Sequence, residues 1–125
     1  MMSDLIIEPD TLTPRVHLDA AAGKITIDGE SYPDSAGIFY SPVFEWVQKF
    51  IAEEKRPLEL HLKLTYFNTG TAKCVMDLLE LLENYVRNGN RARAFWHYQE
   101  EDEDMQMSGE EFAEDVTLDF TFVSH

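Results

Sequence analysis

The amino-acid sequence predicts an α/β fold in which helices pack against one mixed β-sheet. The first observation concerns the chain from residue 58 onward. There, strand-like segments, in which hydrophobic and polar residues alternate, are separated by segments whose hydrophobic residues recur at helical spacing. The second is that two short alternating segments come before them, joined by a small-residue turn that is typical of an antiparallel hairpin. A hairpin followed by strand–helix units predicts a sheet with both antiparallel and parallel pairs.

The opening hairpin is predicted from residues 16–18 and 25–27, which alternate hydrophobic and polar side chains on either side of the Ala-Ala-Ala-Gly turn at 20–23. A turn-rich connector follows at 30–35. Hydrophobic residues then recur at helical spacing over 39–51, which predicts an amphipathic helix.

The start of this helix is open to two interpretations. Asp34 or Ser35 caps the helix, and Pro42 then lies inside it and kinks it. Alternatively, Ser41 is the cap and Pro42 takes the first helical position, where its missing N–H has no consequence. In both cases the helix ends at the charged run 53–57.

The second half of the chain is predicted to form three strands and two helices. The expected ranges are a strand at 58–67, a helix from about Thr71 to Arg87, a strand at 92–98, an acidic helix from Asp102 or Ser108 to Glu114, and a strand at 116–122. Ser108 lies three residues before Glu111, which is a capping-box pattern, and Gly89 suits the left-handed residue that closes a helix. No linker or repeat divides the chain, so residues 1–125 are expected to form a single domain.

Composition narrows the classes of function. The formal net charge of −14 argues against nucleic acid and anionic membrane surfaces as partners, because both favour positively charged proteins. Residues 99–125 hold ten acidic side chains and no Lys or Arg; this segment is either a solvated surface or one that steers a basic partner. The sequence shows no signal-peptide pattern and no apolar run long enough to span a membrane, so a cytoplasmic protein is expected.

Motifs of enzyme chemistry are missing from the sequence. It has no CxxC, HExxH, GxGxxG, Walker or GxSxG motif, and the EF-hand-like start at Asp102 lacks the required glycine and closing glutamate. His61 and His97 lie on predicted strands that could be neighbours, but no third metal ligand is in view. We therefore expect no catalytic residue, no metal and no cofactor.

The junction between the strand at 58–67 and the next helix is the most informative segment. Free backbone N–H groups and the helix dipole at such a junction favour negative charge. Its polar residues are either helix caps or a phosphate acceptor, and Asn68, Thr69 and Thr71 are more capping groups than one helix needs. Gly70 lowers helix propensity where a partner would approach the backbone, and Lys73, four residues after Thr69, could offset a phosphate.

Several short segments, in this order, resemble the SiaC-type regulatory phosphoproteins. The segments are Thr13-Pro14, Gly29-Glu30-Ser31-Tyr32-Pro33, Phe44-Glu45-Trp46-Val47, Leu64-Thr65-Tyr66-Phe67-Asn68-Thr69, Trp96-His97-Tyr98 and Glu110-Glu111-Phe112-Ala113-Glu114. The resemblance implies a fold similar to anti-sigma-factor antagonists, that is, a STAS-like (SpoIIAA-like) domain. It also implies phosphorylation on the threonine of an Asn-Thr-Ser-Ser segment, which corresponds to Thr69. Gly70 and Thr71 replace the two serines, so Thr71 is a rival acceptor.

The resemblance further implies a non-enzymatic, partner-switching function. A cognate protein kinase would phosphorylate the threonine, a PP2C-type phosphatase would remove the phosphate, and the unmodified form would bind and activate a diguanylate cyclase, raising cyclic-di-GMP and promoting biofilm formation. The expected partner-binding loop consists of Asn68, Thr69, Gly70, Thr71 and Lys73. Two alternatives remain: a STAS-like module that binds an anti-sigma factor or small ligand without phosphorylation, and a minor enzyme or metal protein built on His61, His97 and the acidic segment.

Overall fold

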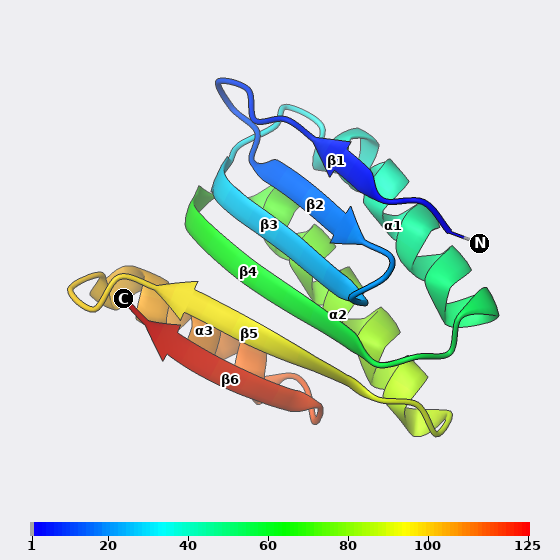
Figure 1. The fold of residues 1–125 in the computed structure, drawn as a ribbon. Helices are drawn as coiled ribbons and strands as arrows, with labels where there is room; N and C mark the ends of the chain where they lie inside the picture. The colour runs from blue at the N-terminus through cyan, green and yellow to red at the C-terminus, as the bar shows by residue number, and fades with distance from the viewer. Residues whose placement is uncertain (1) are drawn as a thin grey trace.

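The computed structural model describes residues 2–125, and within them six strands and three helices follow one another along the chain (Figure 1). In order they are β1 (Leu5–Ile7), β2 (Arg15–Asp19), β3 (Lys24–Ser31), α1 (Ala36–Glu53), β4 (Leu58–Phe67), α2 (Thr69–Arg87), β5 (Ala92–Tyr98), α3 (Glu103–Glu114) and β6 (Asp119–Ser124). The predicted α/β class is confirmed.

The six strands form one mixed sheet in chain order, β1-β2-β3-β4-β5-β6. The pairs β1–β2 and β2–β3 are antiparallel, whereas the strands from β3 to β6 run parallel. One helix joins each parallel pair, and because such crossovers share one handedness, consecutive neighbours place all their helices on the same face. Figure 1 shows α1, α2 and α3 on one side of the sheet, which leaves the opposite side uncovered.

The core lies between the sheet and the helices. Alternate residues of β4 point toward the helices and are buried: Leu58, Leu60, Leu62 and Leu64. Trp96 of β5 is also buried, and its ring packs against the rings of Phe67 and Phe112, with centroids 6.1 and 5.4 Å away. No helix in the described chain is long and apolar enough to cross a membrane.

The turn at 20–23 joins β2 to β3, as the sequence predicts. Gly23 has a φ of 65°, and a Cβ at this position would collide with the backbone oxygen of Pro57, so the turn requires glycine. The register places Val16 opposite Ile27, and both side chains are fully buried.

Helix α1 begins after Ser35, so the interpretation in which Ser41 is the cap is wrong. Pro42 lies inside the helix, where its ring nitrogen has no N–H to offer the preceding turn. The residues on this side of the helix, including Ile38 and Pro42, are exposed, so water can satisfy the carbonyl that loses its partner.

The other differences concern ends of elements. Helix α2 begins at Thr69, two residues before the expected start, because Asn68 caps it. The predicted capping box at Ser108 is wrong, since α3 already begins after Asp102, whose side chain accepts the Met105 N–H at 3.0 Å. The patterns do not predict β1, because a strand of three residues is too short to show alternation.

Candidate regulatory site at the start of α2

Asn68 fixes the start of α2. Its Oδ1 accepts the backbone N–H of Thr71 at 2.9 Å, which caps the helix. Its Nδ2 donates to the carbonyl of Pro33 at 3.0 Å, and its backbone N–H donates to the carbonyl of Ser31 at 3.1 Å. The junction between β4 and α2 is therefore tied at two points to the segment that follows β3.

The side chain of Thr71 is fully buried. Its hydroxyl lies 2.8 Å from the hydroxyl of Ser31 and donates to the Ser31 carbonyl at 3.2 Å, while the Ser31 hydroxyl lies 2.6 Å from that of Tyr40. Burial raises the pKa of Tyr40 to about 12, so the phenol remains a hydrogen-bond donor. A chain of donation from Tyr40 to Ser31 to Thr71 satisfies all three hydroxyls and closes Thr71 off from solvent.

Thr69 is the first residue of α2 and is exposed. The free N–H groups and dipole of a helix start favour an anion at this position. Lys73, one turn later, has a side chain that is 81% exposed, and its nearest carboxylate, Asp77, is 3.8 Å away. The ammonium group is therefore within one helical turn of Thr69 and only loosely held.

A groove of about 390 Å³ lies beside Thr69, between α2 and α3. Its apolar lining comes from Phe67, Ala72, Met76 and Phe112. Its polar rim comes from Thr69, Lys73, Ser108, Glu111 and Asp115. Any change in the charge of Thr69 therefore alters a surface that offers both apolar and charged contacts.

Gly70 allows the starts of α1 and α2 to approach closely, which the sequence does not reveal. A Cβ at this position would lie 3.1 Å from the Cβ of Ala36, the first residue of α1. The starts of the two helices therefore pack closely, and the small residue permits this contact.

The histidines lie on the uncovered face of the sheet. His61 Nδ1 lies 3.0 Å from His97 Nε2, as expected for neighbouring strands, and His97 Nδ1 lies 3.0 Å from His125 Nε2. The two ring nitrogens of His97 thus face different partners, so the three rings do not converge on one metal position. The acidic helix α3 packs on the opposite face (Figure 1), and among the described residues no acidic side chain of that segment joins His61 and His97 in a group of three that could hold a metal.

Ser31 and Tyr40 complete the region and were missed by reasoning from the residues. Ser31 is the last residue of β3 and lies 40 positions before Thr71 in the sequence. Tyr40 lies one turn into α1, 31 positions before Thr71. A single sequence gives no signal that pairs hydroxyls so far apart. Only the segment Gly29-Glu30-Ser31-Tyr32-Pro33, quoted for the family resemblance, indicated that this region matters.

Known proteins share this architecture. A family model described as "SiaC family regulatory phosphoprotein" matches residues 7–125. A protein of Pseudomonas aeruginosa strain UCBPP-PA14 is 39% identical over 124 residues, which cover 99% of this chain and 98% of that protein. The solved structure of SiaC of Pseudomonas aeruginosa matches with a TM-score of 0.92 and 38% identity, covering 99% of this chain and 100% of that chain.

A second solved structure contains the diguanylate cyclase SiaD in complex with its activator SiaC, from the same organism. A chain of this complex matches with a TM-score of 0.94 and 38% identity, covering 98% of this chain and 100% of that chain. The mixed sheet with three helices on one face (Figure 1) is thus that of a small α/β domain, and the matching family model is one of regulatory phosphoproteins. The chain belongs to the SiaC family of regulatory phosphoproteins.

Proposed function

We propose that this protein is a non-enzymatic phospho-switch in which Thr69 accepts the phosphate. The observation that carries the proposal is the contrast between two neighbouring threonines. Thr69 is exposed, whereas Thr71 is fully buried and hydrogen-bonded to Ser31. A kinase must bring the acceptor hydroxyl into its own active site, and Thr69 can reach one without opening the core.

A phosphate on Thr69 would lie at the start of α2, where backbone N–H groups and the helix dipole stabilise an anion. Lys73 would pair with it from the next turn. The same phosphate would add charge and bulk at the rim of the groove between α2 and α3. A partner that covers this rim would have to desolvate the charge, which is unfavourable unless the partner supplies Arg or Lys. Phosphorylation is therefore expected to release a partner of the unmodified form.

The partner that we propose for the unmodified form is a diguanylate cyclase. The support is the complex in which a chain 38% identical to this one accompanies SiaD, for which SiaC is the activator. The switch would then control cyclic-di-GMP synthesis and, through it, biofilm formation. A cognate protein kinase and a PP2C-type phosphatase would add and remove the phosphate in the cytoplasm. Membership of a regulatory phosphoprotein family supports this part.

Phosphopeptide mapping after incubation with the cognate kinase and ATP tests the choice of acceptor. We expect a gain of one phosphate in intact mass, located on Thr69, and no gain in Thr69→Val. A phosphate on Thr71 would contradict the proposed acceptor. No gain at all would favour the alternative of a STAS-like module that binds an anti-sigma factor or small ligand without modification.

A further inference from the structure

We propose that Asp4, His17 and Asp19 form a binding site for a zinc-class divalent cation, and that the ion fastens the N-terminal strand to the β2–β3 hairpin. We call these residues the N-terminal triad. One ligand atom from each of the three lies within 4.8 Å of the others. His17 Nε2 and Asp4 Oδ2 are 3.3 Å apart. The triad lies at the opposite edge of the sheet from β6, away from the histidines of β4 and β5.

The strand pairing brings these three side chains together. His17 and Asp19 alternate onto the same face of β2, and both are partly exposed. Leu5 pairs with Leu18, so the next position along places Asp4 opposite Asp19. Two carboxylates opposite each other on neighbouring strands repel. Within the described chain, Lys24 pairs with Asp19 in the strand register but forms no ion pair with it, so a bound cation would relieve this repulsion.

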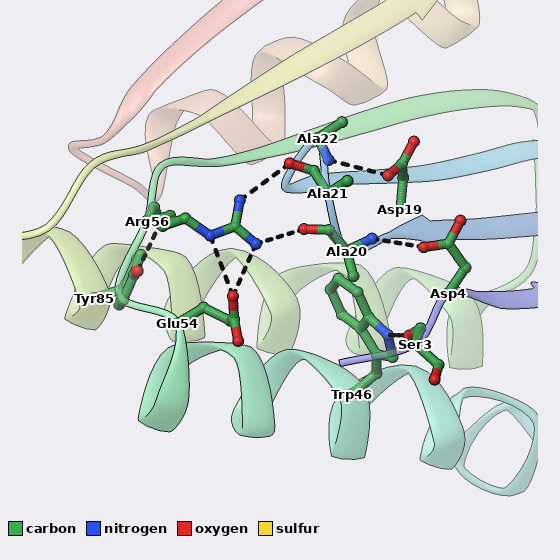
Figure 2. Close-up of polar contacts among 10 residues, drawn as sticks. All are labelled: Ser3, Asp4, Asp19, Ala20, Ala21, Ala22, Trp46, Glu54, Arg56 and Tyr85. Atoms are coloured by element: carbon green, nitrogen blue, oxygen red, sulfur yellow. Dashed lines mark hydrogen bonds and ion pairs between the residues drawn. The ribbon is translucent and has the colours of Figure 1, made fainter. Parts of the chain in front are cut away.

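The carboxylates are oriented by the hairpin backbone. Asp4 Oδ1 accepts the N–H of Ala20 at 2.9 Å, and Asp19 Oδ1 accepts the N–H of Ala22 at 3.0 Å, as Figure 2 shows. These bonds leave the second oxygen of each carboxylate pointing away from the hairpin backbone; Asp4 Oδ2 contacts His17 Nε2 at 3.3 Å, a contact that a shared ion would replace. Bonds of this kind, which orient a metal ligand from outside, commonly accompany metal sites.

Arg56 holds the same turn from the other side. Its guanidinium donates to the carbonyl of Ala20 at 2.6 Å and to that of Ala21 at 3.1 Å (Figure 2). The carbonyl of Arg56 accepts the hydroxyl of Tyr85 at 2.7 Å. The hairpin is therefore fixed before any ion binds, and only small side-chain movements of the triad are needed to coordinate one.

The donor set indicates the class of ion. One imidazole nitrogen and two carboxylate oxygens suit Zn²⁺, whereas Mg²⁺ and Ca²⁺ prefer oxygen donors alone. Three protein ligands leave at least one position for water, which is typical of an exposed site of moderate affinity.

The expected consequence is order in the N-terminal segment. β1 has three residues and lies at the edge of the sheet, and the other side-chain anchor near it is the indole N–H of Trp46, which donates to the Ser3 carbonyl at 2.9 Å (Figure 2). An ion shared by Asp4 and β2 would hold the edge strand β1 on β2. It would thereby keep the backbone groups of β2 that face β1 paired.

Isothermal titration with ZnCl₂ tests the site, using the full chain without an affinity tag and after removal of metal by a chelator. We expect one zinc ion per chain, with affinity reduced at least about tenfold in His17→Ala and in Asp4→Asn. The matched control is His97→Ala, which breaks up the row of three histidines on the uncovered face and should leave the affinity unchanged. MgCl₂ at the same concentration should give no comparable heat.

Amide hydrogen exchange provides the second readout. Zinc should slow exchange at Leu5–Ile7 in the natural chain and have no such effect in His17→Ala. The proposed site is overturned if zinc does not bind, if His17→Ala binds zinc as tightly as the natural chain, or if binding is lost in His97→Ala. Zinc binding at the triad without slower exchange at β1 would overturn the fastening role.

Discussion

Three buried hydroxyls determine which threonine is available at the surface. Tyr40, Ser31 and Thr71 satisfy one another and the Ser31 carbonyl, and no buried side-chain polar atom in the described chain lacks a partner. An unpaired buried hydroxyl would cost about 1–3 kcal/mol, so the chain resists any rotation of Thr71 outward. Because residues two apart on an α-helix are rotated by about 200° around its axis, fixing Thr71 inward leaves Thr69 outward.

Thr71→Val and Thr69→Val form a matched pair that tests this difference. Thr71→Val keeps the shape of the side chain but leaves the Ser31 hydroxyl without its acceptor, so we expect a loss of about 1–3 kcal/mol in the free energy of unfolding. Thr69→Val changes an exposed side chain and should stay within about 0.5 kcal/mol. Urea denaturation measures both, and equal losses would contradict the burial of Thr71.

At the scale of elements, helix starts position the candidate regulatory site. Asn68 caps α2 and also binds the Pro33 carbonyl, while Gly70 allows α1 and α2 to approach. The site therefore depends on the relative placement of two helices and the end of β3. Substitutions that weaken the contacts between these two helix starts and the end of β3 should lower the stability of the protein.

Asn68→Ala and Asn68→Asp separate the two hydrogen bonds of the cap. Alanine removes both bonds, and we expect a loss of about 1–2 kcal/mol in unfolding free energy. Aspartate keeps the capping oxygen and loses the donor to Pro33, so its loss should be smaller. Chemical denaturation distinguishes them, and an aspartate variant as unstable as the alanine variant would show that the cap contributes little.

Gly109→Ala and Gly37→Ala test how closely α3 packs on the sheet. A Cβ at Gly109 would lie 2.5–2.8 Å from indole atoms of Trp96, whereas a Cβ at Gly37 has no atom within 4 Å. We expect Gly109→Ala to lower the melting temperature through overpacking. Gly37→Ala should raise it, because alanine is favoured in a helix by up to about 1 kcal/mol. A melting temperature unchanged by Gly109→Ala would mean that α3 is not seated on Trp96.

At the scale of the whole molecule, one face of the sheet is covered by the three helices and the other face is uncovered (Figure 1). A row of side chains crosses the uncovered face, in which Glu59 contacts His61, His61 contacts His97, and His97 contacts His125, each at 3.0 Å. One set of neutral tautomers satisfies the row: each Nε2–H donates, and Nδ1 of His61 and His97 accepts. A second proton on the ring of His61 or His97 would occupy the accepting Nδ1 and break its hydrogen bond.

Stability should therefore fall in mildly acidic solution. Burial, aided by the charges of Lys63, His61, His125 and Lys24, lowers the pKa of His97 to about 4, against about 6.5 in an unfolded chain. Between these values the unfolded chain binds more protons, so stability is complete above about pH 6.5 and is lost progressively as the pH falls toward 4.

The urea midpoint at pH 7 and pH 5 measures this effect. His97→Gln should show a smaller decrease between the two pH values than the natural chain, because the glutamine cannot take up a proton. Carboxylates such as Glu59 titrate in both proteins, so the comparison isolates the histidine. Equal decreases in the two proteins would contradict the proposed source of the acid sensitivity.

The strands and helices that are long enough to show a regular hydrophobic period were predictable from the sequence. Alternation gave β4 and helical spacing gave α2, since each is long enough to show its period. The start of α3 was ambiguous because Asp102 and Ser108 are both good caps. The structure has the longer helix, whose first turn is held by Asp102 and by the indole N–H of Trp96, which donates to the Met105 carbonyl. Thr69 was singled out by its place at a helix start and predicted as the acceptor from the family resemblance, but the inward direction of Thr71 depends on Ser31, far away in the sequence.

The most direct test of the central claim is the affinity of the chain for the proposed diguanylate cyclase partner before and after phosphorylation, with Thr69→Val treated in parallel. The account predicts that unmodified protein and Thr69→Val both bind, and that the chain phosphorylated on Thr69 binds at least about tenfold more weakly, a difference of about 1.4 kcal/mol. Equal affinity of the phosphorylated and unmodified forms would contradict it.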